Sequence, residues 1–251
     1  MSKPKFAVVT GAGTGIGRAV ATALVEAGWS TVFTGRRLEL LEEACHSASG
    51  HEARALPVAC DVTKPDAVER LFARVEAEFG RLDLLFNNAG MGYRSTPIDE
   101  IPVEVWQDVV AVNVTGSFLC ARAAFGMMRR QSPQGGRIVN NGSISAHAPR
   151  PGSVPYTTTK HAITGLTKTL ALDGRPYDIA CGQIDIGNAL TEMALPMTQG
   201  VPQANGDVVP EAVMDVRYVA DAVVHMAGLP LDTNVLFMTV MASKMPFVGR
   251  G

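Results

Sequence analysis

Two side chains that can move a proton stand four residues apart in this sequence, Tyr156 and Lys160. On a helix, residues i and i+4 share a face, so the phenol and the ammonium can enter one cleft. A neighbouring cation favours the phenolate, which makes Tyr156 a candidate general acid or base. Ser143 lies thirteen residues earlier, where its hydroxyl can donate to a substrate carbonyl, with Ser145 as the local competitor. His147 is the next candidate for the acid.

A glycine-rich segment, residues 10–17, lies between a predicted strand and a predicted helix. In that context small residues let the backbone approach a pyrophosphate, and the helix N-terminus offers unpaired N–H groups. A glycine-rich turn that binds nothing is the alternative, and the strand–turn–helix context weighs against it. The spacing differs from that of a P-loop and no Lys-Ser/Thr follows, which argues against an ATPase. The candidate cofactor contacts here are Gly11, Thr14, Gly15, Ile16 and Gly17.

The end of the second predicted strand carries Gly35, Arg36 and Arg37. An acidic residue at this position would bind the ribose hydroxyls of NAD and repel a 2′-phosphate. Gly35 stands where that acid is expected, and guanidinium groups bind a phosphate dianion well. The alternative is that both arginines are solvated residues that open a helix. We therefore predict that NADP is preferred over NAD.

Two more segments follow predicted strands and provide weaker candidates for the same cofactor. Asp61 and Val62 follow the third strand, where the carboxylate can either accept a hydrogen bond from an adenine amino group or cap the next helix. Asn88, Ala89 and Gly90 follow the fourth strand, where small residues let the backbone pass close to a ligand. A simple turn is the alternative there.

Alternating strands and helices must position these residues. Strands are predicted over residues 6–10, 31–34, 55–60, 82–86, 137–140, 179–184 and 235–240. Helices are predicted over residues 15–27, 38–47, 65–79, 102–130, 156–172 and 215–228. This alternation implies parallel strands with helices on both faces, so a single α/β domain with a doubly wound sheet is expected over residues 1–251. The segments 90–101 and 187–210 are predicted loops, and the second follows a strand's carboxyl end, where ligands bind in such sheets.

The composition is that of a globular chain with a sizeable apolar core. Of 251 residues, 47% are hydrophobic, and 22 basic against 24 acidic residues leave a net charge of −2. This balance provides no basic field for nucleic acid or for an anionic membrane. Residues 109–128 are mostly apolar, but Arg122 would lie deep in lipid at a cost of roughly 3 kcal/mol or more, so a buried helix is expected. We expect a soluble, cytoplasmic protein whose four cysteines are buried free thiols.

Together these residues resemble the short-chain dehydrogenase/reductase family, in its short, non-extended branch. The resemblance covers nearly the whole chain and rests on the glycine-rich segment, on residues 87–90, and on Asn113, Ser143, Tyr156 and Lys160. It implies a Rossmann fold with a seven-stranded parallel sheet and an Asn-Ser-Tyr-Lys tetrad. By the resemblance, Tyr156 is the general acid or base, and Lys160 assists it and holds the nicotinamide ribose. Ser143 then polarises the carbonyl, and Asn113 anchors a water in the proton relay.

The chain departs from the family pattern after the sixth predicted strand and near its C-terminal end. The family usually has Asn-Pro-Gly where this chain has Asp185, Ile186 and Gly187. Thr191 survives in a Thr-x-Met pattern, and the resemblance assigns it to the nicotinamide carboxamide. The usual C-terminal Asp-Gly-Gly segment is missing, so the substrate side is expected to differ from the family pattern.

The expected function is an NADP(H)-dependent oxidoreductase that reduces a ketone or aldehyde or oxidises the corresponding alcohol. A non-catalytic NADPH-binding regulator is the alternative from another class, and the complete tetrad favours the enzyme. A sugar-nucleotide epimerase or dehydratase is a weaker option, because little chain is left for a substrate domain. The few charges in residues 187–210 favour a medium-sized, partly apolar carbonyl compound as the small-molecule partner. By the resemblance, the long helices form a contact between subunits, so a homotetramer or homodimer is expected.

Overall fold

A seven-stranded sheet forms the centre of the computed structural model, which describes residues 4–50 and 52–248. Its strands are β1 (Lys5–Thr10), β2 (Trp29–Gly35), β3 (Ala55–Ala59), β4 (Leu84–Asn87), β5 (Gly136–Asn141), β6 (Ile179–Ile186) and β9 (Phe237–Val240). The order is β3-β2-β1-β4-β5-β6-β9, and every neighbouring pair is parallel. The order reverses between β1 and β4, which confirms the predicted doubly wound, Rossmann-type sheet and places its ligand crevice at that point.

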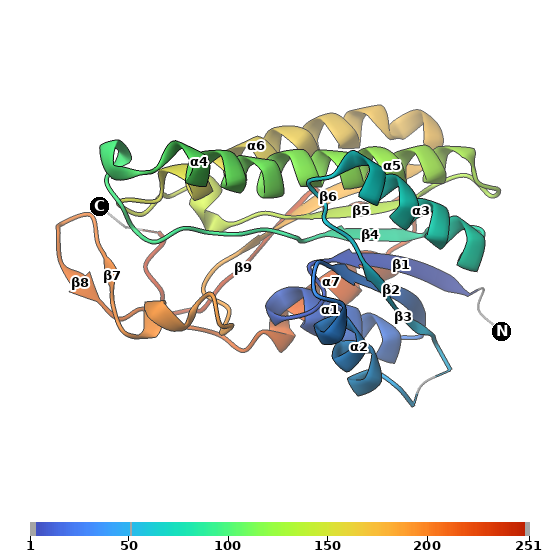
Figure 1. Cartoon of the computed structure of the whole chain (residues 1–251), viewed down its shortest axis with the longest axis horizontal. Coiled ribbons are helices and arrows are strands. Elements are labelled where there is room, and N and C mark those ends of the chain that lie inside the picture. The colour runs from blue at the N-terminus through green and yellow to red at the C-terminus, as the bar shows by residue number, and fades with distance from the viewer. Residues whose placement is uncertain (1–3, 51, 249–251) are drawn as a thin grey trace.

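Helices cover both faces of the sheet, as parallel strands require. One face carries α1 (Gly15–Glu26), α2 (Leu38–Ser47) and α7 (Arg217–Gly228), and the other carries α3 (Pro65–Phe79), α4 (Val103–Val110), α5 (Ser117–Arg130) and α6 (Val154–Asp173) (Figure 1). Two separate apolar layers result, one around α1 and α7 and one around α3 and α5. Strands β4 and β6 are buried along their whole length, because apolar layers lie on both sides of them.

Local signals in the sequence explain where helix α3 begins and ends. Helix α3 begins at Pro65, whose missing N–H is not needed in a first turn, and Asp66 follows there. It ends before Gly80, which adopts the left-handed conformation (φ +70°) that favours glycine. These bounds are those predicted from the sequence.

The predicted helix over 102–130 is one continuous run, Val103–Arg130, and by length and composition it could cross a membrane. In the fold it packs on the sheet, with Val109, Cys120, Ala124 and Met128 fully buried. A π-helical turn at Ala111–Gly116 separates α4 from α5, and such turns concentrate at functional sites.

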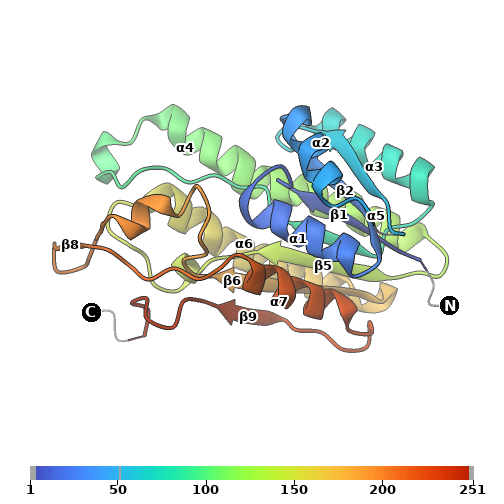
Figure 2. The same ribbon diagram turned by 90° about the horizontal axis from the view of Figure 1, so that it is seen from below.

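The long segment after β6 is more structured than the predicted loop over 187–210. It contains a short 3₁₀ turn at Leu195–Thr198 and a two-stranded hairpin, β7 (Val201–Pro202) and β8 (Val208–Val209). Figures 1 and 2 show this hairpin at the end of the molecule toward which the sheet's strands point, beside the C-terminal segment. The segment is therefore placed to bound whatever binds at the carboxyl edge of the sheet.

All four cysteines are buried free thiols, as predicted. Burial raises the pKa of Cys45, Cys120 and Cys181 to about 12 and that of Cys60 to about 11. Since the thiolate is the reactive form, these side chains fill the core and do not act as nucleophiles.

Candidate active site

A chain of hydrogen bonds links the carboxyl ends of β1, β4 and β5. The Thr10 hydroxyl oxygen accepts from the main-chain N–H groups of Asn88 and Ala89, each at 2.8 Å. The Asn88 amide donates to the Thr10 carbonyl at 2.8 Å and accepts from the Asn141 amide at 2.7 Å. The ammonium of Lys160 donates to the Asn141 carbonyl at 2.8 Å. Hydrogen bonds thus join the ends of three strands, and the arrangement includes the predicted residues Asn88, Ala89 and Lys160.

The glycine-rich turn packs directly on this arrangement. Gly11 has φ +67°, and a β-carbon on it would lie 3.0 Å from the Asn88 amide nitrogen. A β-carbon on Gly17 would overlap the Gly11 carbonyl oxygen and lie 2.6 Å from the same nitrogen. Thr14 begins α1 without a side-chain cap, and no acidic residue lies in the first turn. The helix N-terminus is therefore available to an anionic group, which fits a dinucleotide pyrophosphate.

The remaining predicted contacts of the glycine turn lie beside it. Ile16 is partly buried and packs on the apolar layer around α1, so it anchors the helix. Thr191 comes from the segment after β6, and a β-carbon on Gly15 would lie 3.4 Å from the Thr191 methyl group. The structure thus brings Thr191 next to the cofactor turn across 176 positions of sequence.

The end of β2 presents two arginines to solvent. Arg36 and Arg37 follow Gly35, and both side chains are exposed. Asp61 is nearby: burial raises its pKa, but hydrogen bonds from the Thr63 N–H and hydroxyl and the charge of Arg36 lower it more, so its pKa lies below the ordinary value. Asp61 closes a turn with Thr63 at 3.0 and 2.8 Å instead of capping α3. The helix-capping alternative is therefore wrong, and the contact of this carboxylate with an adenine amino group stays a prediction.

Asn113 braces the segment after β4 against α6. It lies in the π-helical turn and is 2% exposed. Its amide oxygen accepts from the Met91 N–H at 2.8 Å, and its amide nitrogen donates to the Met91 carbonyl at 2.9 Å and to the Thr159 hydroxyl at 3.0 Å. Gly90 is close as well, since a β-carbon there would lie 3.3 Å from the Asn113 oxygen.

The π-helical turn also packs closely on the residue after Asp61. A β-carbon on Gly116 would lie 2.7 Å from a methyl carbon of Val62, which is buried. Val62 is therefore a packing residue between β3 and the long helix, at the edge of the predicted cofactor site.

Tyr156 and Lys160 lie on one face of α6, as predicted. The Lys160 nitrogen is 5.4 Å from the centre of the Tyr156 ring. Lys160 is only 6% exposed, and in the described part of the chain its one hydrogen-bond acceptor is the Asn141 carbonyl. An ammonium has three N–H donors, so two remain for a ligand. Tyr156 is half-buried, with its ring edge beside Gly92.

Ser143 is held by one hydrogen bond at its hydroxyl and one at its main-chain N–H. It is 4% exposed, and its hydroxyl oxygen accepts from the Ser145 N–H at 3.1 Å. The hydroxyl hydrogen therefore remains free to be donated to a carbonyl. The Ser143 N–H donates to Asp185 Oδ1 at 3.0 Å. Ser145 contributes its main chain to this turn, which separates the roles of the two serines.

A buried ion pair, which the sequence did not reveal, ties the loop before α6 to the segment after β6. Arg150 forms a hydrogen-bonded ion pair with Glu211, whose side chain is fully buried. Asn188 and Gln203 also donate to this carboxylate, at 2.8 and 3.0 Å. Burial raises the pKa of Glu211, but hydrogen bonds from Arg150, Gln203 and Asn188 lower it more, so it lies below the ordinary value. The partners are 61 positions apart, and only a tertiary contact joins them.

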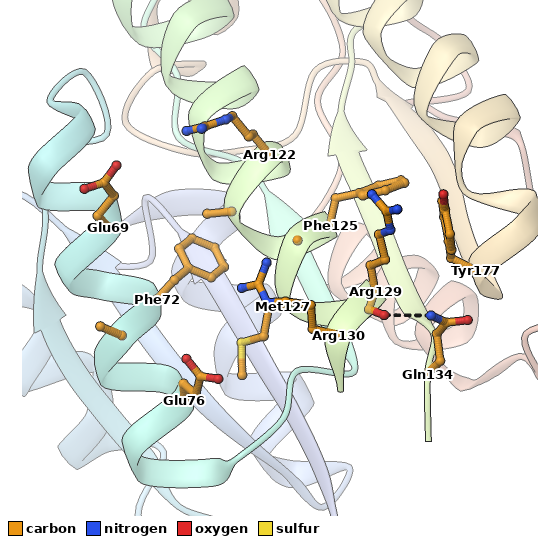
Figure 3. A pocket seen from close by; sticks show the side chains of 13 residues that line it. Glu69, Phe72, Glu76, Arg122, Phe125, Met127, Arg129, Arg130, Gln134 and Tyr177 are labelled. Carbon is orange, nitrogen blue, oxygen red and sulfur yellow. Dashed lines mark hydrogen bonds between the residues drawn. The ribbon is translucent and has the colours of Figure 1, made fainter. Parts of the chain in front are cut away.

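A surface groove between α3 and α5 lies apart from these residues. Glu69 and Glu76 of α3 face Arg122 and Arg130 of α5 across it (Figure 3). None of its lining residues belongs to the arrangement around Ser143. We therefore place the active site at the carboxyl edge of the sheet and not in this groove.

Comparison with known proteins agrees with this geometry. The short chain dehydrogenase family model matches residues 5–201. Short-chain dehydrogenase anuF of Penicillium roqueforti (strain FM164) is 35% identical over 244 residues, covering 88% of each chain. Gluconate 5-dehydrogenase of Gluconobacter oxydans (strain 621H) is 38% identical over 191 residues, covering 74% of this chain and 72% of that one.

Solved structures show the same fold with either cofactor. The 3-ketoacyl-(acyl-carrier-protein) reductase from Brucella melitensis, complexed with NADH, superposes with a TM-score of 0.85 at 24% identity, over 95% of this chain and 97% of that one. A metagenomic short-chain oxidoreductase in complex with NADP has a TM-score of 0.80 at 26% identity, with the same coverage. With the family model and the curated relatives, this shows that the chain belongs to the short-chain dehydrogenase/reductase family and is an NAD(P)-dependent oxidoreductase.

Proposed function

We propose that this enzyme prefers NADP(H) and interconverts a ketone or aldehyde with the corresponding alcohol. The cofactor preference is supported by Arg36 and Arg37, whose side chains are exposed and make no hydrogen bond or ion pair within residues 4–50 and 52–248. At Gly35 no acidic side chain repels a 2′-phosphate, so two free guanidinium groups can bind it.

Titration of both cofactors tests this preference. NADPH should bind at least about tenfold tighter than NADH, which is about 1.4 kcal/mol. Replacing both Arg36 and Arg37 by alanine should remove the difference. Arg175→Ala, which removes an exposed arginine elsewhere, should leave it unchanged. Equal affinities in the unaltered protein would contradict the proposal.

The chemistry is supported by the grouping of Tyr156, Lys160 and Ser143 at one edge of the sheet. When bound, the nicotinamide supplies or accepts the hydride. The two unused donors of Lys160 can hold the ribose hydroxyls, and its ammonium lies beside the Tyr156 ring. In the reducing direction Ser143 donates a hydrogen bond to the carbonyl oxygen, and Tyr156 transfers its phenolic proton to that oxygen.

Tyr156→Phe tests the proton donor, because it keeps the ring and its packing and removes only the hydroxyl. NADPH affinity should be unchanged, while kcat should fall by roughly 10² or more. Tyr177→Phe, at a tyrosine that packs on Phe125 away from the site, is the matched control and should retain normal kcat. Near-normal kcat in Tyr156→Phe would move the acid elsewhere, with His147 the next candidate.

The substrate is proposed to be partly apolar. The segment after β6 exposes a group of apolar side chains: Leu190, Met193, Leu195, Val208 and Val209. Carbonyl compounds with an apolar chain should therefore give higher kcat/KM than small polar ones. A panel of ketones, aldehydes and alcohols, followed by NADPH absorbance, measures this directly.

The enzyme is also proposed to form a homodimer or homotetramer. The long helix exposes Val103, Trp106 and Phe118, which are 67%, 36% and 50% accessible. A second copy of the chain would bury this apolar surface, and soluble oligomers are usually symmetric. Light scattering at micromolar concentration should show a multiple of the chain mass. Phe118→Glu should lower that mass, and a monomer mass for the unaltered protein would contradict the proposal.

A further inference from the structure

One buried carboxylate holds both ends of the short turn that carries Ser143. Asp185, at the carboxyl end of β6, is 1% exposed. Its Oδ1 accepts from the Ser143 N–H at 3.0 Å, and its Oδ2 pairs with His147 Nε2 at 2.9 Å. The 3₁₀ turn Ile144–Ala146 lies between these two contacts. The carboxylate therefore spans the turn from its first residue to the residue that ends it.

Two neighbouring residues, Gln183 and Gly142, accommodate the Asp185 carboxylate. The amide of Gln183, which is fully buried, donates to Asp185 Oδ1 at 2.6 Å. A β-carbon on Gly142 would overlap the same oxygen and lie 2.6 Å from the Gln183 amide nitrogen. The residue before the serine must therefore be glycine for the carboxylate to reach the Ser143 N–H. Gly142, Ser143 and Gln183 therefore all pack against the buried Asp185 carboxylate.

We propose that Asp185 is a positioning residue for Ser143, and that His147 holds the second oxygen of the same carboxylate. This rests on the proposed role of Ser143 as hydrogen-bond donor to the substrate carbonyl. The Ser143 oxygen accepts from the Ser145 N–H, and this contact sets the direction of the hydroxyl that donates to the carbonyl. That orientation depends on the backbone of the turn, which Asp185 fixes at one end directly and at the other through the imidazole.

The two contacts can be removed together, and the contact with His147 can also be removed alone. Asp185→Ala removes both. Asp185→Asn keeps the size and one oxygen for the Ser143 N–H. His147→Ala removes only the imidazole, and His147→Gln returns a side-chain amide that can reach the carboxylate. Arg137→Lys is the control, because Arg137 is 2% exposed at the opposite end of β5. Within residues 4–50 and 52–248, its side-chain hydrogen bonds go to the segment between α7 and β9.

A double-mutant cycle with Ser143 separates positioning from general stability, with kcat measured on the ketone or aldehyde that the enzyme turns over fastest. Asp185→Ala should lower kcat by about 30-fold in the unaltered protein but by less than about threefold when Ser143 is already alanine. His147→Ala should cost about fivefold, and His147→Gln should recover most of that loss. The kcat of Asp185→Asn should lie between that of the unaltered protein and that of Asp185→Ala. The asparagine variant also tests the proposal if the alanine variant does not fold. NADPH affinity should stay unchanged throughout, as should kcat in Arg137→Lys.

Amide hydrogen exchange provides a readout that needs no substrate. In Asp185→Ala or Asp185→Asn, exchange in the turn 143–147 should accelerate by about tenfold, and it should not change in Arg137→Lys. Equal kcat losses from Asp185→Ala with and without Ser143, or unchanged exchange in the turn, would overturn the positioning role and leave the proposed function standing. Unchanged kcat in Ser143→Ala would instead overturn the role of the serine, and the positioning role with it.

Discussion

Removing Arg150 should expose how much the ion pair with Glu211 stabilises this fold. The Glu211 side chain is fully buried and that of Arg150 is 15% exposed. Arg150→Met therefore removes the charged partner of a buried carboxylate, which keeps the Asn188 and Gln203 amides as donors. Breaking a buried pair in this way costs about 3–5 kcal/mol, because the buried carboxylate loses its ion-pair partner. The same change should loosen the segment after β6, which Glu211 joins to the loop before α6.

Urea unfolding, extrapolated linearly to water, measures this loss. The double variant Arg150→Met with Glu211→Met removes both charges, and it should regain most of the lost stability, since a buried pair and an apolar pair of similar volume are often nearly equal. Amide exchange in residues 195–210 should rise in Arg150→Met and recover in the double variant. A loss below about 1 kcal/mol in Arg150→Met, or a double variant less stable than either single one, would refute this reasoning.

The ion pair between Arg150 and Glu211 should also make the stability of the fold depend on pH. The pKa of Glu211 in the folded protein lies below its ordinary value of 4.5. A carboxyl group with a lowered pKa contributes stability above its unfolded pKa and loses it as the pH falls through the folded value. The stability difference between the unaltered protein and Glu211→Gln should therefore be full at pH 7 and should shrink as the pH falls below 4.5. A difference that stays constant on acidification would contradict the assignment.

Three further substitutions test the site. Gly35→Asp with Arg36→Leu should shift the preference to NADH in cofactor titrations, because a carboxylate then meets the ribose, and a β-carbon at position 35 makes only ordinary contact. Lys160→Ala should weaken NADPH binding and lower kcat together, since the ammonium serves both the ribose and the phenol; a change in only one would contradict the dual role. Ser145→Ala should leave kcat within about threefold of normal, because position 145 contributes its main-chain N–H to Ser143, and that group is retained.

Local sequence patterns were sufficient to predict most of the fold. Helix α2 was predicted with its observed bounds, and so was α3, whose limits come from Pro65 and Gly80. The strands were found because central parallel strands are continuous apolar runs between turn residues. The glycine-rich turn, and Tyr156 with Lys160, were also readable, since their geometry depends on positions within one turn or one helix. Thr191 was a candidate only through the resemblance to the family, and its contact with the glycine turn was not predicted.

Tertiary structure alone decided which polar side chains meet at the carboxyl edge of the sheet. Asp185 was visible only as a departure from Asn-Pro-Gly, and its contact with Ser143 joins residues 42 positions apart. Arg150 and Glu211 are 61 positions apart, and neither carries a local signal that names its partner. The physical reason is the range of the interactions: periodicity and turn chemistry act over a few residues, whereas these contacts exist only after β5 and β6 have paired and brought their following loops together.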